Sequence, residues 1–264
     1  MIWGSGKVIA CVGGLLMLLL ADVSGCTTSA PVDNKVSQTT QLSLEKLRQQ
    51  AQGITVKVMS TEFLGSGIIL GRQNTVYTVI TNAHVLRAGT SPYRIQTVDG
   101  QIHKANLLSK VRFNKHDLAV LEFRSVGTNY HVAALGYPPT AGDEVFATGF
   151  PFDQEELKVK SFKLTRGKVS LVLDKALEGG YQVGYTNELA KGMSGGPLLN
   201  SRGEVVGING MHAYPLWDAP SMFIDGLQAD ENLHQQIIRL SWAVPIDKVV
   251  QMMPTKISPK ITSD

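Results

Sequence analysis

The sequence predicts an all-β fold made of barrels or sandwiches. Between about residue 53 and residue 250, short apolar runs alternate with turn residues, a pattern typical of about twelve short strands. No long stretch of helical periodicity lies among them, so βαβ units around a parallel sheet are not expected. The 26 Gly and 11 Pro among 264 residues supply the many turns that this fold needs.

The predicted strands follow one another at similar intervals. Turn residues at 71–74, 99–100 and 200–203 each separate two apolar runs, and the Asp-Gly pair at 99–100 is a strong hairpin signal. The runs that we interpret as strands are 54–59, 68–70, 76–80, 93–98, 101–104, 118–123, 145–148, 162–164, 169–173, 181–185, 198–199, 205–208 and 242–244.

Three short helices complete the prediction. Residues 44–51 have helical propensity, and Ser43 is a candidate N-cap. Residues 228–239 place three apolar side chains on one face, and residues 246–253 form a helix close to the end of the chain.

Composition excludes several classes of function. The net charge is +3 from 25 basic and 22 acidic residues, and no run of five Lys or Arg occurs, so no nucleic-acid partner is expected. The two cysteines, Cys11 and Cys26, leave residues 27–264 without a disulfide, a thiolate zinc site or a cysteine nucleophile. The scattered histidines lack ligand spacing, so neither a metal site nor a cofactor is expected: His103, His131, His212 and His234.

The N-terminal segment predicts export. Lys7 precedes an apolar run at 8–20 that is too short to span a bilayer comfortably, and small residues follow it, as in a signal peptide at 1–25. The sequence Val-Ser-Gly-Cys at 23–26 resembles a bacterial lipobox, which implies cleavage before Cys26 and acylation of that cysteine. A plain signal peptide or an uncleaved anchor are the alternatives.

The region after Cys26 predicts a tether. Residues 27–41 are rich in Thr, Ser and Gln and have little to bury. Together with the short helix they make up a connecting region at 26–52. The expected location is therefore the cell envelope, as a membrane-anchored lipoprotein that is periplasmic or extracytoplasmic.

Three segments carry candidate chemistry. His84 follows a β-rich run in the segment Val-Ile-Thr-Asn-Ala-His-Val at 79–85. Asp117 opens a buried strand in His-Asp-Leu-Ala-Val-Leu at 116–121. Ser194 lies in the glycine-dense loop Gly-Met-Ser-Gly-Gly-Pro-Leu at 192–198, which a strand follows.

In this chain order the three segments resemble the His, Asp and Ser motifs of trypsin-like, chymotrypsin-fold serine proteases. TNAHV and SGGPL are most similar to bacterial Deg-type proteases, here without a PDZ domain. The resemblance covers about 200 residues. It implies a protease domain at 53–254 made of two six-stranded antiparallel β-barrels, at about 53–135 and 140–250, with a C-terminal helix and a tail at 255–264.

The resemblance also implies roles for residues. The implied activity is that of a serine endopeptidase that hydrolyses polypeptides through an acyl-enzyme. His84 is the implied general base, Asp117 holds its tautomer, and Ser194 is the nucleophile. The backbone N–H groups of Gly192 and Ser194 are the implied oxyanion hole. Met193 stands where animal trypsins carry an aspartate, so activation by insertion of a new N-terminus is not expected.

The sequence says less about substrate specificity than about the catalytic residues. The positions that match the family's S1 pocket and the edge that pairs with substrate are Glu188, Leu189, Asn209, Gly210, Met211 and His212. Glu188 either attracts a basic substrate side chain or points away from the pocket. The long aromatic-rich loop at 212–227 is expected to shape the cleft.

Two other functions stay open at this point. Residues 192–196 also fit the Gly-x-Ser-x-Gly elbow of α/β-hydrolase esterases, with Asp225 and His234 as further members. That fold needs a helix after the serine, whereas Pro197 and a strand follow here. The other alternative is a catalytically silent binding module of the trypsin-like fold.

Overall fold

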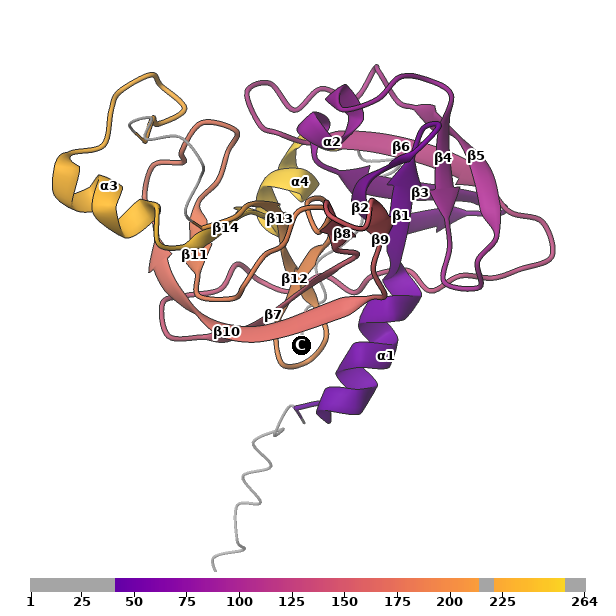
Figure 1. Cartoon of the computed structure of the whole chain (residues 1–264), viewed down its shortest axis with the longest axis horizontal. Helices are drawn as coiled ribbons and strands as arrows, with labels where there is room; N and C mark the ends of the chain where they lie inside the picture. Colours follow the sequence, from indigo (N-terminus) through magenta and orange to yellow (C-terminus); the bar gives the residue numbers. More distant parts are fainter. Residues whose placement is uncertain (1–40, 214–220, 255–264) are drawn as a thin grey trace, which may run out of the picture. The chain divides into compact units, whose positions relative to one another are not determined.

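A computed structural model describes residues 41–213 and 221–254. In this part of the chain two antiparallel sheets each close into a six-stranded barrel, which confirms the predicted fold class (Figure 1). The predicted signal peptide, Cys26 and nearly all of the tether lie outside the described residues. So do residues 214–220 of the long loop and the tail at 255–264.

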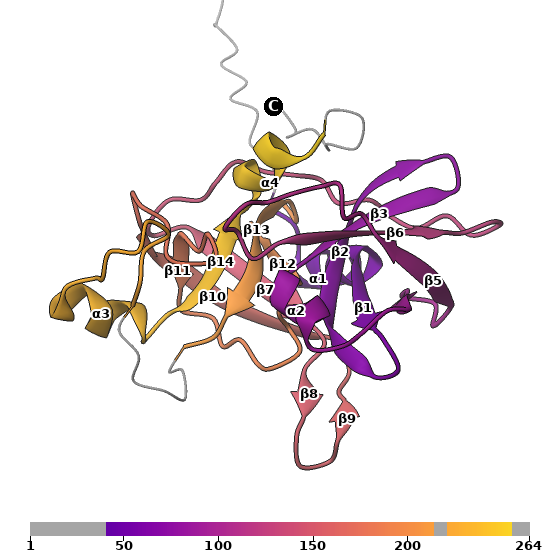
Figure 2. The ribbon, with the colours of Figure 1, turned by 90° about the horizontal axis from the view of Figure 1, so that it is seen from above.

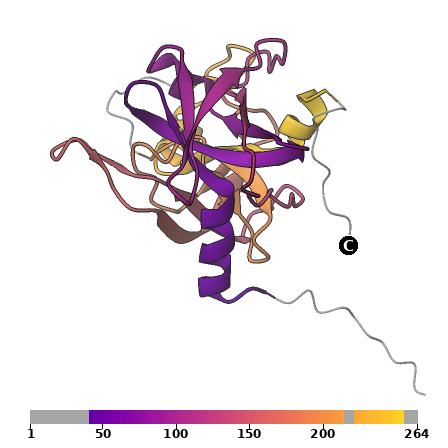
Figure 3. The ribbon, with the colours of Figure 1, turned by 90° about the vertical axis from the view of Figure 1, so that its right-hand side faces the viewer.

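The first barrel contains strands β1 to β6 in the spatial order β1-β2-β3-β6-β5-β4. In Figure 3 it faces the viewer, with the N-terminal helix leading into it. Its strands are β1 (Thr55–Met59), β2 (Phe63–Gln73), β3 (Val76–Thr81), β4 (Tyr93–Gln96), β5 (Ile102–Leu107) and β6 (Ala119–Arg124).

The second barrel has the spatial order β10-β11-β14-β13-β12-β7. A separate two-stranded hairpin, β8–β9, stands away from it in Figure 2. The strands of this half are β7 (Glu144–Gly149), β8 (Phe152–Asp153), β9 (Lys158–Val159), β10 (Lys163–Val172), β11 (Val183–Tyr185), β12 (Pro197–Leu199), β13 (Val205–Met211) and β14 (Ser241–Pro245).

Four short helices flank the barrels: α1 (Leu44–Ile54), α2 (Ala83–Arg87), α3 (Glu231–Ile237) and α4 (Ile246–Met252). The hydroxyl of Ser43 accepts a hydrogen bond from the N–H of Lys46 at 3.3 Å, so the predicted N-cap of α1 is present. Helix α2 was not predicted, because five residues are too few to show a 3.6-residue period. None of the described helices is long and apolar enough to cross a bilayer.

Two strands are longer than predicted. Strand β2 extends in both directions beyond the apolar run at 68–70, and β10 joins the two runs at 162–164 and 169–173 into one strand. The first six residues of β10 pair with β7 and its last ones with β11. Its exposed middle includes Arg166, so the apolar signal stops there although the backbone ladder continues.

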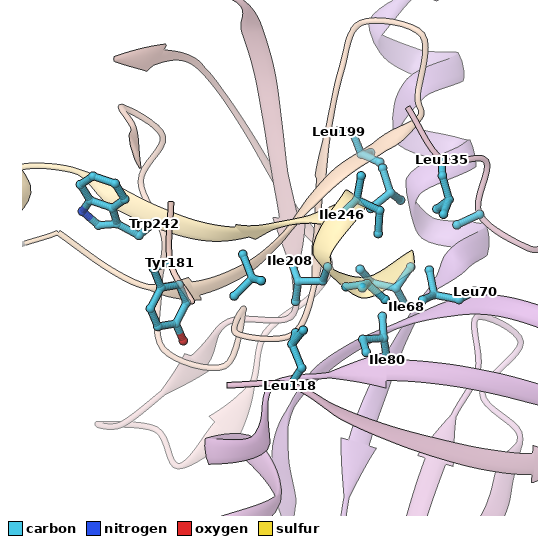
Figure 4. Close-up of a cluster of buried hydrophobic side chains, with 14 of the residues drawn as sticks. Ile68, Leu70, Ile80, Leu118, Leu135, Tyr181, Leu199, Ile208, Trp242 and Ile246 are labelled. Atoms are coloured by element: carbon cyan, nitrogen blue, oxygen red, sulfur yellow. The ribbon is translucent and has the colours of Figure 1, made fainter. Parts of the chain in front are cut away.

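A shared core fixes the two barrels against each other. Ile68 and Ile80 of the first barrel, Ile208 of the second and Ile246 of α4 are fully buried in one cluster (Figure 4). Leu118 joins the same cluster. Because Leu118 directly follows Asp117, packing of this core fixes the position of the candidate aspartate.

Candidate active site

The end of β3 positions His84. The strand stops at Thr81, and the single turn of α2 begins at Ala83, so His84 lies in the first turn of the helix. Asn82, fully buried between them, donates from its amide nitrogen to the backbone oxygen of Asp117 at 2.9 Å. The histidine segment and the aspartate segment are therefore joined through the backbone as well as through side chains.

His84 and Asp117 make two hydrogen bonds. The ring atom Nδ1 lies 2.5 Å from Oδ2 of Asp117, and the backbone N–H of His84 donates to Oδ1 at 2.8 Å. An ionised carboxylate can only accept, so Nδ1 carries the proton and Nε2 presents a lone pair. Among the described residues Nε2 has no hydrogen-bond partner. The pair thus holds the tautomer that can take a proton from a nucleophile.

Asp117 stays ionised in this setting. Burial of the carboxyl raises its pKa, but the hydrogen bonds from His84 and the Tyr181 hydroxyl, together with the attraction that His84 exerts when it is protonated, outweigh burial and leave the pKa below the ordinary 3.8. The hydroxyl of Tyr181 donates to Oδ2 at 2.6 Å, and Arg87 lies 3.6 Å from Oδ1. At neutral pH the residue is therefore a carboxylate.

Ser194 lies in a loop of the second barrel that contacts the first barrel. Its backbone oxygen accepts from the N–H of Ser66 at 2.9 Å, which ties the serine loop to β2. A Cβ built on Gly65 would lie 2.9 Å from Val85 and 3.2 Å from that same backbone oxygen, so the serine and histidine segments flank one glycine. The Ser194 hydroxyl donates to the backbone oxygen of Gly210 at 3.2 Å. The structure thus brings His84, Asp117 and the Ser194 loop to one place.

The backbone carbonyl groups just before Ser194 are held by hydrogen bonds. The oxygen of Lys191 accepts from the N–H of Phe152 at 2.8 Å. The oxygen of Gly192 accepts from the hydroxyl of Ser66 at 2.8 Å, and the N–H of Phe150 donates to the same hydroxyl at 3.0 Å. These bonds fix the orientation of the peptide planes on both sides of Gly192.

The same loop leaves two amide groups available. The N–H groups of Met193 and Gly195 donate to backbone oxygens at 3.0 and 2.8 Å. The N–H groups of Gly192 and Ser194 donate to no group within the part of the chain that the structure describes. Two unpaired N–H donors on either side of Met193, close to a serine hydroxyl, form an arrangement that can stabilise an oxyanion.

Glycine is required at position 192 for two reasons. Its φ is +89°, in the region that side chains rarely adopt. In addition, a Cβ there would lie 2.6 Å from the backbone oxygen of Phe150 and 2.9 Å from the ring of Phe63. The sequence therefore permits this loop shape only with glycine at that position.

Residues 65–208, which contain His84, Asp117 and Ser194, match the family described as the trypsin-like peptidase domain. The chain belongs to this family. The matched range begins beside Ser66 in β2 and ends at Ile208 in β13, so it includes the His84, Asp117 and Ser194 segments.

Known proteins similar to this trypsin-like domain include two bacterial peptidases. One is the serine protease Do-like HtrA of Bacillus subtilis, 33% identical over 157 residues, which cover 56% of this chain and 33% of that protein. Another is the glutamyl endopeptidase of Staphylococcus aureus strain MW2, 25% identical over 173 residues, which cover 59% of this chain and 49% of that protein. The chain thus spans between a third and a half of the length of these relatives.

A solved structure shows the same fold. The serine endoprotease from Yersinia pestis superposes with a TM-score of 0.56 at 22% identity, over 80% of this chain and 65% of that one. At this identity the similarity establishes the fold.

The structure separates the six predicted specificity residues of the trypsin-like domain. Met211 and His212 line a cleft of about 770 Å³ that also contains His84 and Asp117. Gly210 lies beside the nucleophile, as described above. These three positions border the site at the half-buried end of β13 and just after it.

The other three specificity positions lie elsewhere. Glu188 has a side chain that is 77% exposed and forms an ion pair with Lys163 of β10 at 3.0 Å, which favours the alternative in which it points away from the pocket. Leu189 is buried in the core of the second barrel with Met193. Asn209 is fully buried and bonds backbone oxygens and the hydroxyl of Tyr185, so it supports the loops rather than facing substrate.

The described part of the long loop forms one wall of the cleft. Met222 lines it, and its backbone oxygen accepts from the N–H of Glu178 at 2.8 Å. Apolar side chains of α3 and its C-terminal end, including Ile237 and Leu240, line the same cleft. Loop and helix together therefore border the site that His84 faces.

The residues of the esterase alternative do not meet Ser194. Asp225 is exposed and forms an ion pair with Lys175 at 2.5 Å, and His234 is buried against the hydroxyl of Ser221 at 3.0 Å. Neither contact involves the nucleophile loop. The geometry therefore favours His84 and Asp117 as the partners of Ser194.

Sequence reasoning missed two supporting residues, Ser66 and Tyr181. The signals that mark them are glycines: Ser66 lies between Gly65 and Gly67, and Tyr181 follows the Gly-Gly pair at 179–180, where both φ angles are positive. Glycines at such places indicate close approach of neighbouring groups.

Replacing Ser66 by Ala is expected to lower peptidase kcat/KM about 10- to 100-fold, because the Gly192 peptide loses its support and shifts within the oxyanion site. The variant leaves the Gly192 oxygen and the Phe150 N–H unpaired, which costs about 1–3 kcal/mol of stability. Ser125→Ala is the matched control, since Ser125 is also buried and bonds a backbone oxygen, that of Thr128, far from the site. Equal kcat/KM in both variants would contradict the role of Ser66.

Proposed function

We propose that the chain is a serine endopeptidase that cleaves polypeptides through an acyl-enzyme formed on Ser194. The observation that carries the proposal is the joint geometry of two features. His84 is held by Asp117 in the tautomer that accepts a proton. The loop of Ser194 presents two unpaired N–H groups. A binding module needs neither feature.

The residues divide the reaction between them. Ser194 Oγ attacks the scissile carbonyl carbon while His84 Nε2 takes its proton. The carbonyl oxygen becomes an anion and accepts from the N–H groups of Gly192 and Ser194. Asp117 stabilises the imidazolium, which then protonates the leaving amine as the C–N bond breaks. Water, activated by His84, hydrolyses the acyl-enzyme and restores the serine.

The Ser194 hydroxyl must reorient before it can react. The Ser194 hydroxyl donates to the oxygen of Gly210, so it must turn about χ1 to donate to His84. Catalytic hydrogen bonds in free enzymes are often long or misaligned and shorten when substrate binds. A substrate backbone that pairs with the end of β13 at Gly210 competes for that oxygen and favours the turn.

Labelling with a fluorophosphonate probe tests the proposal. The full-length chain is treated with the probe, and the labelled peptide is identified by mass spectrometry. We expect a single adduct on Ser194 that forms in the wild type and not in His84→Ala. A chain that hydrolyses no peptide and takes up no probe is instead a binding module.

We further propose that the protein is a lipoprotein of the cell envelope, held to a membrane through Cys26. The support is the sequence at 1–26, namely the apolar run followed by Val-Ser-Gly-Cys. Two or three acyl chains on one residue anchor a protein that a single chain would release.

Cys26→Ser is expected to abolish incorporation of labelled palmitate and to move the protein from the membrane fraction to the soluble fraction. Cys11→Ser is the matched control because it removes the other cysteine of the chain. It should remain labelled and membrane-bound. Retention of the Cys26→Ser protein at the membrane would instead indicate an uncleaved anchor.

A further inference from the structure

We propose that Tyr181 is a positioning residue for catalysis, which orients the Asp117 carboxylate through its hydroxyl. This inference rests on the proposed peptidase function. Tyr181 lies just before β11 and is 7% exposed, and its hydroxyl donates to Asp117 Oδ2 at 2.6 Å. In Figure 4 its ring lies at the edge of the shared core with the hydroxyl directed away from Trp242.

Tyr181 bonds Asp117 from a different structural element than His84 does. His84 and Arg87, both of α2, supply the other contacts to the carboxylate. Within the described part of the chain, Tyr181 is the one hydrogen-bond donor to this carboxylate from outside that helix. Without this bond, His84 would be the main residue that orients the Asp117 carboxylate, although the role of the carboxylate is to orient His84.

The segment that carries Tyr181 is fixed relative to Asp117. The backbone N–H of Asp117 donates to the oxygen of Gly179 at 2.8 Å, and the Tyr181 backbone oxygen accepts from the N–H of Leu177 at 2.8 Å. The hydroxyl is therefore presented from a closed turn that is bonded to the aspartate itself. Such preorganisation is what a positioning group requires.

Gly210 makes room for the phenol. The φ of Gly210 is not positive, so its backbone conformation does not demand glycine. A Cβ at this position would instead overlap the hydroxyl and ring of Tyr181. Glycine at 210, next to Ser194, therefore leaves the space that the phenol of Tyr181 occupies.

The phenol remains a donor throughout the working range of pH. Burial and the charge of Asp117 raise the pKa of Tyr181 well above 10.0. The ionisable groups that face Asp117 are His84, Arg87 and Tyr181, and Tyr185 of β11 lies near Tyr181. A change in pH dependence after removal of the hydroxyl therefore reports on the aspartate and histidine pair.

Tyr181→Phe tests the inference because it removes the hydroxyl and keeps the ring. We expect kcat for a peptide substrate to fall about tenfold with KM changed less than about twofold, since one charge-assisted hydrogen bond is lost and no substrate contact changes. We also expect the acid limb of kcat/KM against pH to move up by about half a pH unit. When Oδ2 accepts one hydrogen bond fewer, its negative charge is less neutralised, so it stabilises the imidazolium more strongly.

Tyr130→Phe is a closely matched control. Tyr130 is also 7% exposed, and its hydroxyl also donates to a carboxylate, that of Asp99, at 3.0 Å in the first barrel. It should lose similar stability and keep the wild-type kcat and pH profile. If Tyr181→Phe is unfolded at the assay temperature, Gly210→Ala displaces the same hydroxyl and should give the same shift of the acid limb.

The outcomes separate the two claims. An active wild type whose Tyr181→Phe variant behaves like Tyr130→Phe overturns the inference and leaves the peptidase proposal intact. A lower kcat with an unchanged acid limb also overturns it, because Tyr181 would then act on folding alone. A wild type that neither cleaves peptides nor reacts with fluorophosphonate refutes both.

Discussion

Replacing Ser194 by Ala is expected to lower kcat for peptide hydrolysis about 10⁶-fold, and replacing His84 by Ala is expected to cost about as much. The reason is that neither group works alone: the hydroxyl is a weak nucleophile until the imidazole accepts its proton. The double variant should therefore be no slower than either single variant. Burst and steady-state kinetics on one peptide substrate measure all three.

The control for these variants comes from the esterase alternative. Asp225→Ala removes the acid that this alternative needs, and its exposed side chain bonds only Lys175 and the backbone N–H of Leu227 in the described part of the chain. It should keep kcat within about twofold of the wild type. Strong loss in Asp225→Ala together with activity in His84→Ala would reverse the assignment of the residues to Ser194.

Asp117→Asn is expected to lower kcat about 10⁴-fold, the size of effect known when the buried aspartate of a serine triad becomes asparagine. An amide nitrogen at the Oδ2 position faces two donors, His84 Nδ1–H and the Tyr181 hydroxyl. It forces the imidazole proton onto Nε2, which can then no longer accept from Ser194. An amide nitrogen at the Oδ1 position faces the backbone N–H of His84 instead.

The same substitution changes how the free energy of unfolding depends on pH. The pKa of Asp117 lies below 3.8 in the folded protein, so its ionised form stabilises the fold above that pH, and this contribution is lost as the pH falls through the folded value. Asp117→Asn lacks the contribution at every pH. Urea unfolding should show a gap between wild type and variant at pH 7 that closes below pH 3.8; a constant gap would contradict the depressed pKa.

Much of the fold and of the candidate site could be predicted because the signals are local. The alternation of apolar runs and turns predicted barrels or sandwiches, and the family resemblance of the segments around His84, Asp117 and Ser194 implied two six-stranded barrels. Helix α2 and the exposed middle of β10 could not be predicted. One is shorter than a helical repeat, and the other lacks an apolar signal.

Local sequence patterns do not reveal the supporting side chains of the site. The Tyr181 hydroxyl bonds a residue 64 positions away, and the Ser66 hydroxyl bonds one 126 positions away. The orientation of Glu188 likewise depends on Lys163, which only the barrel brings beside it. Such contacts follow from strand register and barrel closure, neither of which a single segment encodes.

The position of Ser66 has a consequence for when the protein can act. Ser66 belongs to the first barrel, yet its hydroxyl and its backbone N–H hold the loop of the second barrel that carries Gly192 and Ser194. In a copy whose two barrels have separated, the Gly192 and Ser194 amides therefore lose this support, and Ser194 is also parted from His84 and Asp117 of the first barrel. We expect such copies to be unable to digest their neighbours, so that proteolytic competence appears only when assembly is finished.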